Sequence, residues 1–258
     1  PERPYLEEVG RPPGRLKIAF STSSPIHNRV HPECVRAVEK TARLLEDLGH
    51  HVEEMQPDID GRALAASYMA MYFGEVAADI DELEPALGRT AKLGDVEAMT
   101  WTLGLLGRSF SSGFLTSALR MWDRTARKMG RFFDTHHIYM TPTTAYPPAK
   151  VGELKPKPAE AMLMNLINTL HAGWLLKVSG MVDTLVERGL ARTPFTQMAN
   201  LCGLPAMSVP LHWTPGGLPC GTHITAPFGD EATLFRLASQ LEEACPWFDR
   251  RPQITRET

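Results

Sequence analysis

A strand–helix–strand pattern near the start constrains this fold more than any other feature of the chain. Leu16 to Phe20 alternates apolar and polar residues and then turns apolar, which indicates a partly buried strand. Pro32 suits the first turn of a helix, and the helical spacing of apolar residues that follows ends at Gly49. His51 to Met55 alternates again. Two strands joined by a crossover helix form a βαβ unit, so we predict a parallel pair.

The rest of the sequence predicts several helices with short strands between them. Helices are expected over 63–80, 96–108, 112–133, 159–190 with interruptions at Gly173 and Gly180, 193–201 and from 230 onward. Strands are expected over 138–140, 206–210 and 221–226. Residues 1–14 are rich in Pro, Glu and Gly, which indicates a linker or extended arm before a single domain over 15–258. The pattern predicts an α/β fold with a mixed sheet covered by helices.

Charge and composition exclude several classes of partner. With 27 Lys and Arg against 30 Asp and Glu, the net charge of the 258 residues is −3, whereas nucleic-acid binders need a basic face. No apolar run approaches the about 20 residues of a membrane span. The four cysteines form no CxxC pair, and the nine histidines form no metal-binding spacing. We therefore expect no nucleic acid, membrane or metal, and a reducing, cytoplasmic location.

Motifs for nucleophilic catalysis are also missing from the sequence. There is no G-x-S-x-G elbow, and no serine lies three positions before any of the eight lysines. The cluster Ser109 to Ser112 has hydroxyl groups, but a nucleophile needs a base and oxyanion donors within reach. Phe110 and Phe114 beside this cluster favour a helix start instead. Spacing alone thus predicts an α/β domain without a complete active site.

Five segments in the same order do point to a family. They are Arg15–Ala19, Met140–Thr143, Thr196–Pro210, Gly217–Gly221 and Asp230–Glu242. The longest reads T-x-x-x-N-L-x-G-L-P-A-x-S-V-P, and the next reads G-L-P-x-G. Together they resemble the C-terminal half of the amidase signature family over about residues 11–250. The ending from Gln240 to Pro252 resembles in particular the hydrolases of the 6-aminohexanoate cyclic dimer.

The resemblance implies an α/β/α sandwich of the amidase signature type and hydrolysis of linear or cyclic amides without a cofactor. Family members use a Ser–cis-Ser–Lys triad in the N-terminal half, and no position of residues 1–258 matches it. With Pro1 as its first residue, the chain is expected to be a C-terminal portion that is inactive alone. Its expected partners are a small amide substrate and either the N-terminal half or a second copy.

Five residues are candidates for substrate binding. Tyr72 and Phe73 belong to an aromatic helix face, and Trp174 follows a glycine; each suits either core packing or a pocket wall. Thr196 and Asn200 lie four apart, so they share one helix face and could bond the other half or the local backbone.

Two alternative functions remain open at this point. One is another amidase of the same family, such as an aryl-amide or fatty-amide hydrolase or an amidotransferase subunit. The other is a non-catalytic α/β module that binds a partner through an exposed sheet edge. If the chain is half of an enzyme, its apolar strands predict an unpaired sheet edge and an apolar patch. We then expect the chain to self-associate or to stay bound to an N-terminal fragment through the sheet.

Overall fold

The computed structural model describes residues 1–178 and 181–251 and confirms the α/β class. The strands are β1 (Lys17–Phe20), β2 (His51–Glu54), β3 (Ile138–Pro142), β4 (Ala206–Trp213) and β5 (Pro219–Thr225). The helices are η1 (Tyr5–Glu7), α1 (Pro32–Asp47), α2 (Gly61–Asp81), α3 (Glu84–Leu87), α4 (Ala98–Gly107), α5 (Ser112–Phe133), α6 (Pro158–Thr169), α7 (Gly173–Val178), α8 (Met181–Leu190), α9 (Gln197–Cys202) and α10 (Glu231–Ala244).

The strands form one mixed sheet in the order β2-β1-β3-β5-β4. The predicted βαβ unit is confirmed, because β1 pairs with β2 in parallel, with Lys17 opposite His51. β3 pairs with the other side of β1, also in parallel. β5 and β4 then continue the sheet antiparallel as a hairpin. β4 is therefore an edge strand, which explains how it can contain Pro210.

Side-chain caps fix where the main helices begin. The imidazole of His31 accepts the N–H of Glu33 at 3.1 Å, with Pro32 in the first turn of α1. At the start of α5, the Ser111 hydroxyl accepts the N–H of Phe114 at 3.2 Å. The serine cluster is thus a helix start, as the sequence indicated.

The region 159–190 divides into α6, α7 and α8, which confirms the predicted interruption at Gly173. Gly173 begins α7 where that helix meets α4 closely, because a Cβ there would lie 2.7 Å from the carbonyl carbon of Leu105. The predicted interruption at Gly180 falls outside the described residues.

The two faces of the sheet differ sharply in chemistry. One face is apolar and is covered by α1 and α10. Its core includes Ile18, Leu45, Ile138, Met140, Val209, Ile224, Leu234, Leu237 and Leu241. The opposite face meets α5, where the ring of Phe132 stands edge-on to that of Tyr139 at 5.5 Å. Helices therefore cover both faces, as the predicted sandwich requires.

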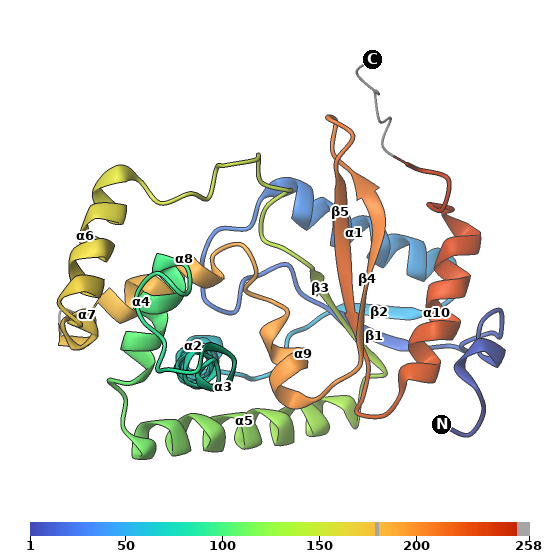
Figure 1. Cartoon of the computed structure of the whole chain (residues 1–258). Coiled ribbons are helices and arrows are strands. Elements are labelled where there is room, and N and C mark those ends of the chain that lie inside the picture. The colour runs from blue at the N-terminus through green and yellow to red at the C-terminus, as the bar shows by residue number, and fades with distance from the viewer. Residues whose placement is uncertain (179–180, 252–258) are drawn as a thin grey trace.

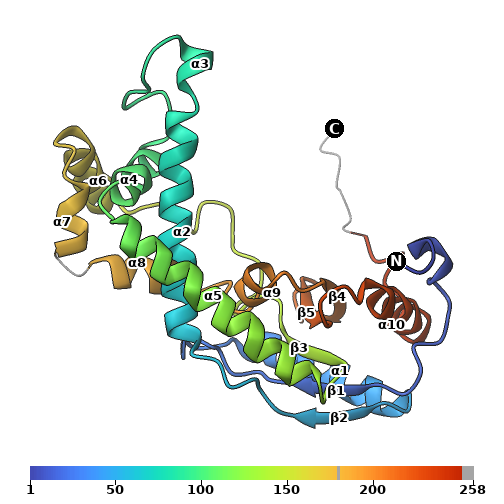
Figure 2. The same cartoon turned by 90° about the horizontal axis from the view of Figure 1, so that it is seen from below.

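A helical lobe lies beside the sheet. Figure 1 shows α2, α4, α6, α7 and α8 gathered on the left, with the sheet, α1 and α10 on the right. In Figure 2 the long helix α5 runs from this lobe to the sheet. The lobe has its own apolar core around Phe73, Leu106 and Ile167. No helix within the described residues is both long and apolar enough to cross a membrane.

The N-terminal segment rests on α10 instead of standing free. The ring of Tyr5 stacks on that of Phe235 with centroids 5.2 Å apart. The Arg236 guanidinium donates to the Glu8 carboxylate at 2.7 Å. The segment that the sequence indicated as an arm thus contains a 3-10 turn and is anchored.

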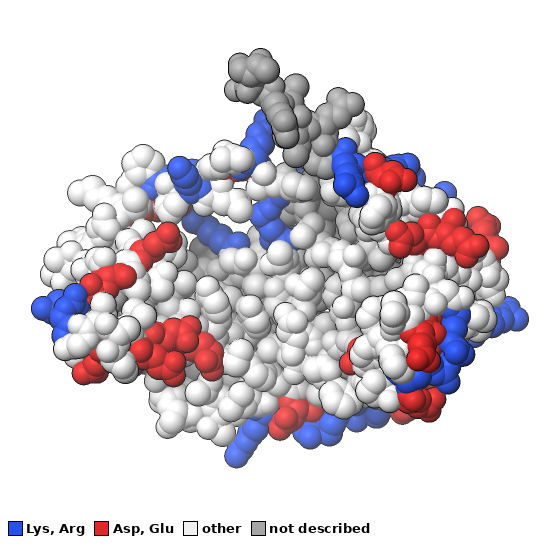
Figure 3. All heavy atoms as spheres, turned by 45° about the vertical axis from the view of Figure 1, so that its right-hand side comes forward, with Lys and Arg blue, Asp and Glu red and all other residues white. Residues whose placement is uncertain are grey.

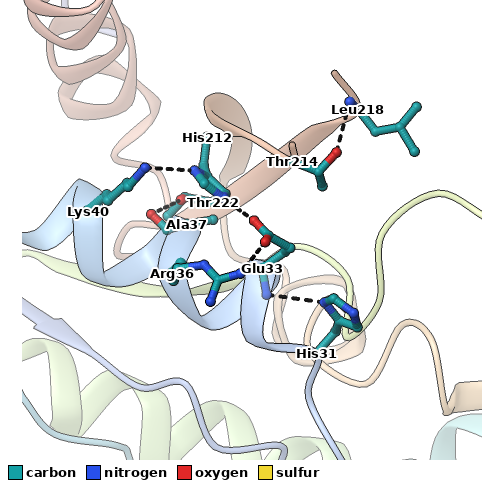
Figure 4. Close-up of polar contacts among 9 residues, drawn as sticks. All are labelled: His31, Glu33, Arg36, Ala37, Lys40, His212, Thr214, Leu218 and Thr222. Atoms are coloured by element: carbon teal, nitrogen blue, oxygen red, sulfur yellow. Dashed lines mark hydrogen bonds and ion pairs between the residues drawn. The ribbon is translucent and has the colours of Figure 1, made fainter. Parts of the chain in front are cut away.

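A buried polar cluster joins α1 to the β4–β5 hairpin (Figure 4). The Nε2 atom of His212 lies 2.6 Å from the Glu33 carboxylate, and both residues are buried. Arg36 donates to the same carboxylate, and Lys40 Nζ lies 3.3 Å from the other imidazole nitrogen. The hydrogen bonds from His212 and then Arg36 lower the pKa of Glu33 despite its burial.

Candidate functional site

Three of the sequence motifs meet on the face of the sheet that lacks an apolar core. The strand pairing places Thr141 of β3 opposite His223 of β5, and His223 opposite Ser208 of β4. Tyr139 and Thr225 form the next pair on the same side. We call Tyr139, Thr141, Ser208, His223 and Thr225 the polar face.

Two hydroxyls of the polar face are buried without a partner. Thr141 is 4 % exposed and Thr225 is 0 % exposed. Neither Oγ1 atom makes a hydrogen bond with any described residue. An unpaired buried hydroxyl costs about 1–3 kcal/mol, so the lack of a hydrogen-bond partner at these two atoms destabilises this part of the fold.

Burial also sets the protonation states on this face. It lowers the pKa of His223 to about 4, so the imidazole is neutral at pH 7. Burial raises the pKa of Tyr139, against a smaller opposite effect of its hydrogen bond with Ser21. The polar face therefore offers uncharged donors and acceptors.

Gly221 keeps one end of this face narrow. A Cβ there would overlap the Ser208 hydroxyl and lie 2.7 Å from that of Thr143. These two hydroxyls bond each other at 2.7 Å. The last glycine of the G-L-P-x-G motif is thus required by close packing.

A cavity of about 480 Å³ lies at the carboxyl ends of β1, β2 and β3. This edge is where α/β sheets usually hold ligands. Its lining mixes apolar residues with polar ones, and the polar ones are Ser23, Ser24, His27, Gln56, Asp60, Tyr139, Thr141 and Gln197. No lysine or arginine occurs among the described residues that line the cavity. The lining includes the Asp60 carboxylate, so the cavity offers hydrogen-bonding groups and no lysine or arginine for an anion.

The five predicted site residues do not meet in this cavity. Phe73 is fully buried in the helical lobe, stacked on Phe110 at 6.2 Å. Tyr72 is 41 % exposed and Trp174 is 57 % exposed. Thr196 is half-buried before α9, and Asn200 is exposed. Their part in substrate binding stays a prediction.

Sequence reasoning missed Thr141, His223 and Thr225. The first two lie inside or beside the quoted T-P-T and G-L-P-x-G segments, so the motifs themselves were a usable signal. What was lacking was the register that places them on one face.

Residues 1–190 match the family model described as Amidase. The chain belongs to the amidase family. The family match confirms the sequence resemblance. The mixed sheet covered by helices confirms the predicted fold class.

Individual amidases support the same conclusion. The chain is 29 % identical over 260 residues to 6-aminohexanoate-cyclic-dimer hydrolase of Pseudomonas sp. (strain NK87), covering 98 % of this chain and 48 % of that one. It is 30 % identical over 241 residues to lipoamidase of Enterococcus faecalis, covering 92 % of this chain and 33 % of that one. A solved 6-aminohexanoate cyclic dimer hydrolase complexed with substrate superposes with a TM-score of 0.83 at 25 % identity, covering 98 % of this chain and 50 % of that one. The chain thus spans about half the length of the two cyclic-dimer hydrolases and about a third of the lipoamidase.

His223 is expected to make this amidase chain sensitive to mild acid. Its folded pKa of about 4 lies below the ordinary value near 6.5, so between these pH values the unfolded state binds the extra proton. Stability is therefore full above pH ~6.5 and falls by about 3 kcal/mol as the pH drops to ~4. Urea unfolding across this range measures the loss. His223→Gln should flatten the profile, whereas the same change at exposed His51 should not; equal profiles would contradict the assignment.

Proposed function

We propose that this chain forms one portion of an amidase that hydrolyses the carbon–nitrogen bond of small amides. The observation that carries the proposal is the superposition of 98 % of the chain on half of a 6-aminohexanoate cyclic dimer hydrolase. We call the half of that hydrolase without a counterpart here the complementary portion.

The proposed reaction is acyl transfer through a serine. A serine of the complementary portion, activated by a Ser–Lys pair, attacks the amide carbonyl carbon. The C–N bond breaks, the amine leaves with a proton, and water then releases the acid from the acyl-enzyme. In this arrangement residues 1–258 are inactive alone and supply the sheet and part of the substrate cavity.

The proposed substrates are linear or cyclic amides of the aminohexanoate type. The cavity lining supplies hydrogen-bonding groups that could hold an amide and has no lysine or arginine to bind an anion. Tyr72 and Trp174 are proposed as pocket walls, since a covering portion would bury their exposed rings. Thr196 and Asn200 are proposed to hydrogen-bond that portion. No cofactor is assigned to the reaction.

The proposed compartment is the reducing cytoplasm. Cys34 and Cys220 pack in one buried cluster yet are free thiols. Burial raises the pKa of both, that of Cys34 to about 12, which keeps them unreactive.

A fusion protein tests this function. In it, residues 1–258 replace the corresponding part of the Pseudomonas hydrolase. We expect the fusion to hydrolyse the 6-aminohexanoate cyclic dimer and to react once with a fluorophosphonate probe at a serine of the complementary portion. We expect neither from residues 1–258 alone. Stoichiometric labelling of this chain at Ser111 or Ser112, lost in the Ser→Ala variant, would contradict the assignment of the reactive serine to the complementary portion.

A further inference from the structure

We propose that this chain binds a second copy of itself through two charged stripes, one on the exposed face of α5 and the other at the exposed end of α2. The arginine stripe consists of Arg120, Arg124, Arg127 and Arg131. The acidic stripe consists of Glu75, Asp79 and Glu82. Neither stripe lines the candidate cavity, so the contact does not depend on the proposed amidase activity.

The arginine stripe is the first observation. Its members follow one another at intervals of four, three and four residues, which places them on one side of the helix. That side lies opposite the buried residues Ala118, Thr125 and Met129, and all of its arginines are exposed. Figure 3 shows Lys and Arg side chains along the lower rim of the molecule, at the height where α5 runs in Figure 1. The one acidic residue of α5 is Asp123.

The acidic stripe is the second observation. Its members are exposed and lie opposite the buried residues Phe73, Ala77 and Ile80. Figure 2 shows this end of α2 projecting from the helical lobe together with α3. Asp79 and Glu82 lie at the C-terminal end of α2, where the negative end of the helix dipole disfavours a carboxylate. A cationic partner would therefore be stabilised at this place.

Neither stripe is neutralised within the chain. No residue of either stripe forms a salt bridge with another described residue. Nearby charges do find partners: Arg108 lies 2.5 Å from Asp81, and Lys128 lies 3.1 Å from Asp58. Like charges three or four residues apart on a helix repel one another, so each stripe destabilises its own helix until opposite charges face it.

The matching spacing selects a second copy as the partner. The intervals of four and three residues in the acidic stripe also occur within the arginine stripe, so three carboxylates can face three guanidinium groups over about 10 Å of helix. The stripes cannot meet within one chain, because α2 and α5 pack against each other through their buried faces. With a net charge of −3, the chain as a whole repels a nucleic acid, whereas a second copy presents the acidic stripe.

Charge-swap variants test the contact. The first variant carries Arg120→Glu, Arg124→Glu and Arg127→Glu, and the second carries Glu75→Lys, Asp79→Lys and Glu82→Lys. In sedimentation, the mass of the unaltered chain should rise with concentration beyond that of a dimer, because two different surfaces meet and each copy keeps one stripe free. Its apparent Kd should increase about tenfold between about 50 and about 500 mM salt.

Mixing the two variants gives the most specific result. Each variant alone should stay monomeric, since like charges then face each other. A mixture of the two should associate as the unaltered chain does, because each variant supplies the stripe that the other needs. The matched control carries Arg29→Glu, Arg43→Glu and Arg62→Glu, which change the net charge equally at exposed positions outside the stripe. This control should associate like the unaltered chain.

Several outcomes would overturn the contact. One is association that persists in both charge-swap variants, which would assign it to another surface such as the sheet edge. Another is association that the matched control also loses. A chain that is monomeric at every concentration overturns the contact too, even if the arginine stripe binds an oligonucleotide. Where a reversed stripe prevents folding, Arg120→Gln, Arg124→Gln and Arg127→Gln remove the attraction without adding repulsion, and unchanged association of that variant overturns the contact.

Discussion

Replacing Glu33 with glutamine is expected to destabilise the chain, because the carboxylate that holds both His212 and Arg36 is lost. The Glu33 carboxylate is the common partner of His212 and Arg36, and it joins α1 to the β4–β5 hairpin. A glutamine keeps the shape but loses the charge. The midpoint of urea unfolding measures the loss.

Two controls make the Glu33 result specific. Glu39→Gln changes an exposed carboxylate of the same helix and should shift stability by less than about 0.5 kcal/mol. In a double-mutant cycle with His212→Gln, the two losses should add to more than the loss of the double variant. Full additivity would show that the pair contributes nothing. Since the pKa of Glu33 is lowered on folding, its contribution is present above the ordinary value near 4.5 and is lost as the pH falls further.

Phe73→Ala is expected to cost about 3–5 kcal/mol, because it empties the centre of the helical-lobe core. Phe73 is fully buried, whereas its neighbour Tyr72 is 41 % exposed and stacks on Tyr68 at 6.3 Å. Tyr72→Ala should therefore cost less than about 1 kcal/mol. Thermal unfolding of both variants compares the two positions.

The same pair tests the substrate-pocket prediction in the fusion. Tyr72→Ala should change the ratio of kcat/KM between a small and a large amide while Tm stays nearly constant. If kcat/KM falls equally for both amides and Tm drops, Tyr72 belongs to the core. Phe73 cannot be judged from activity alone, since its loss reduces the amount of folded protein.

Local chemistry explains why most elements could be predicted from the sequence. Pro32 marks the start of α1 because proline restricts the backbone to an angle that suits the first helical turn. Gly49 marks its end because glycine lets the backbone leave the helix. The apolar periodicity of α5 and its serine cap define all 22 residues of that helix. β4 extends three residues past the predicted Pro210, because only an edge strand tolerates a proline and edge position is a property of the sheet.

The candidate site could not be predicted in the same way. Thr141 and Thr225 are separated by most of the helical lobe and the β4 strand, so only the register of β3 against β5 brings them together. A slip of one residue would turn the Thr225 side chain to the apolar face. Nor does a sequence show which hydroxyls lack a partner, since that depends on every neighbour in the fold.

The position of β3 has a consequence for how the chain folds. The N–H of Lys17 at the start of β1 bonds the imidazole of His137, 120 residues away, and all of α1 to α5 lies between them. Closing so long a loop is entropically costly and slows folding, whereas the helices between can form from local contacts. During synthesis, β1 leaves the ribosome well before β3. Until β3 arrives, one side of β1 stays available to wrong partners, so the sheet is the part of this chain most exposed to aggregation and to chaperones.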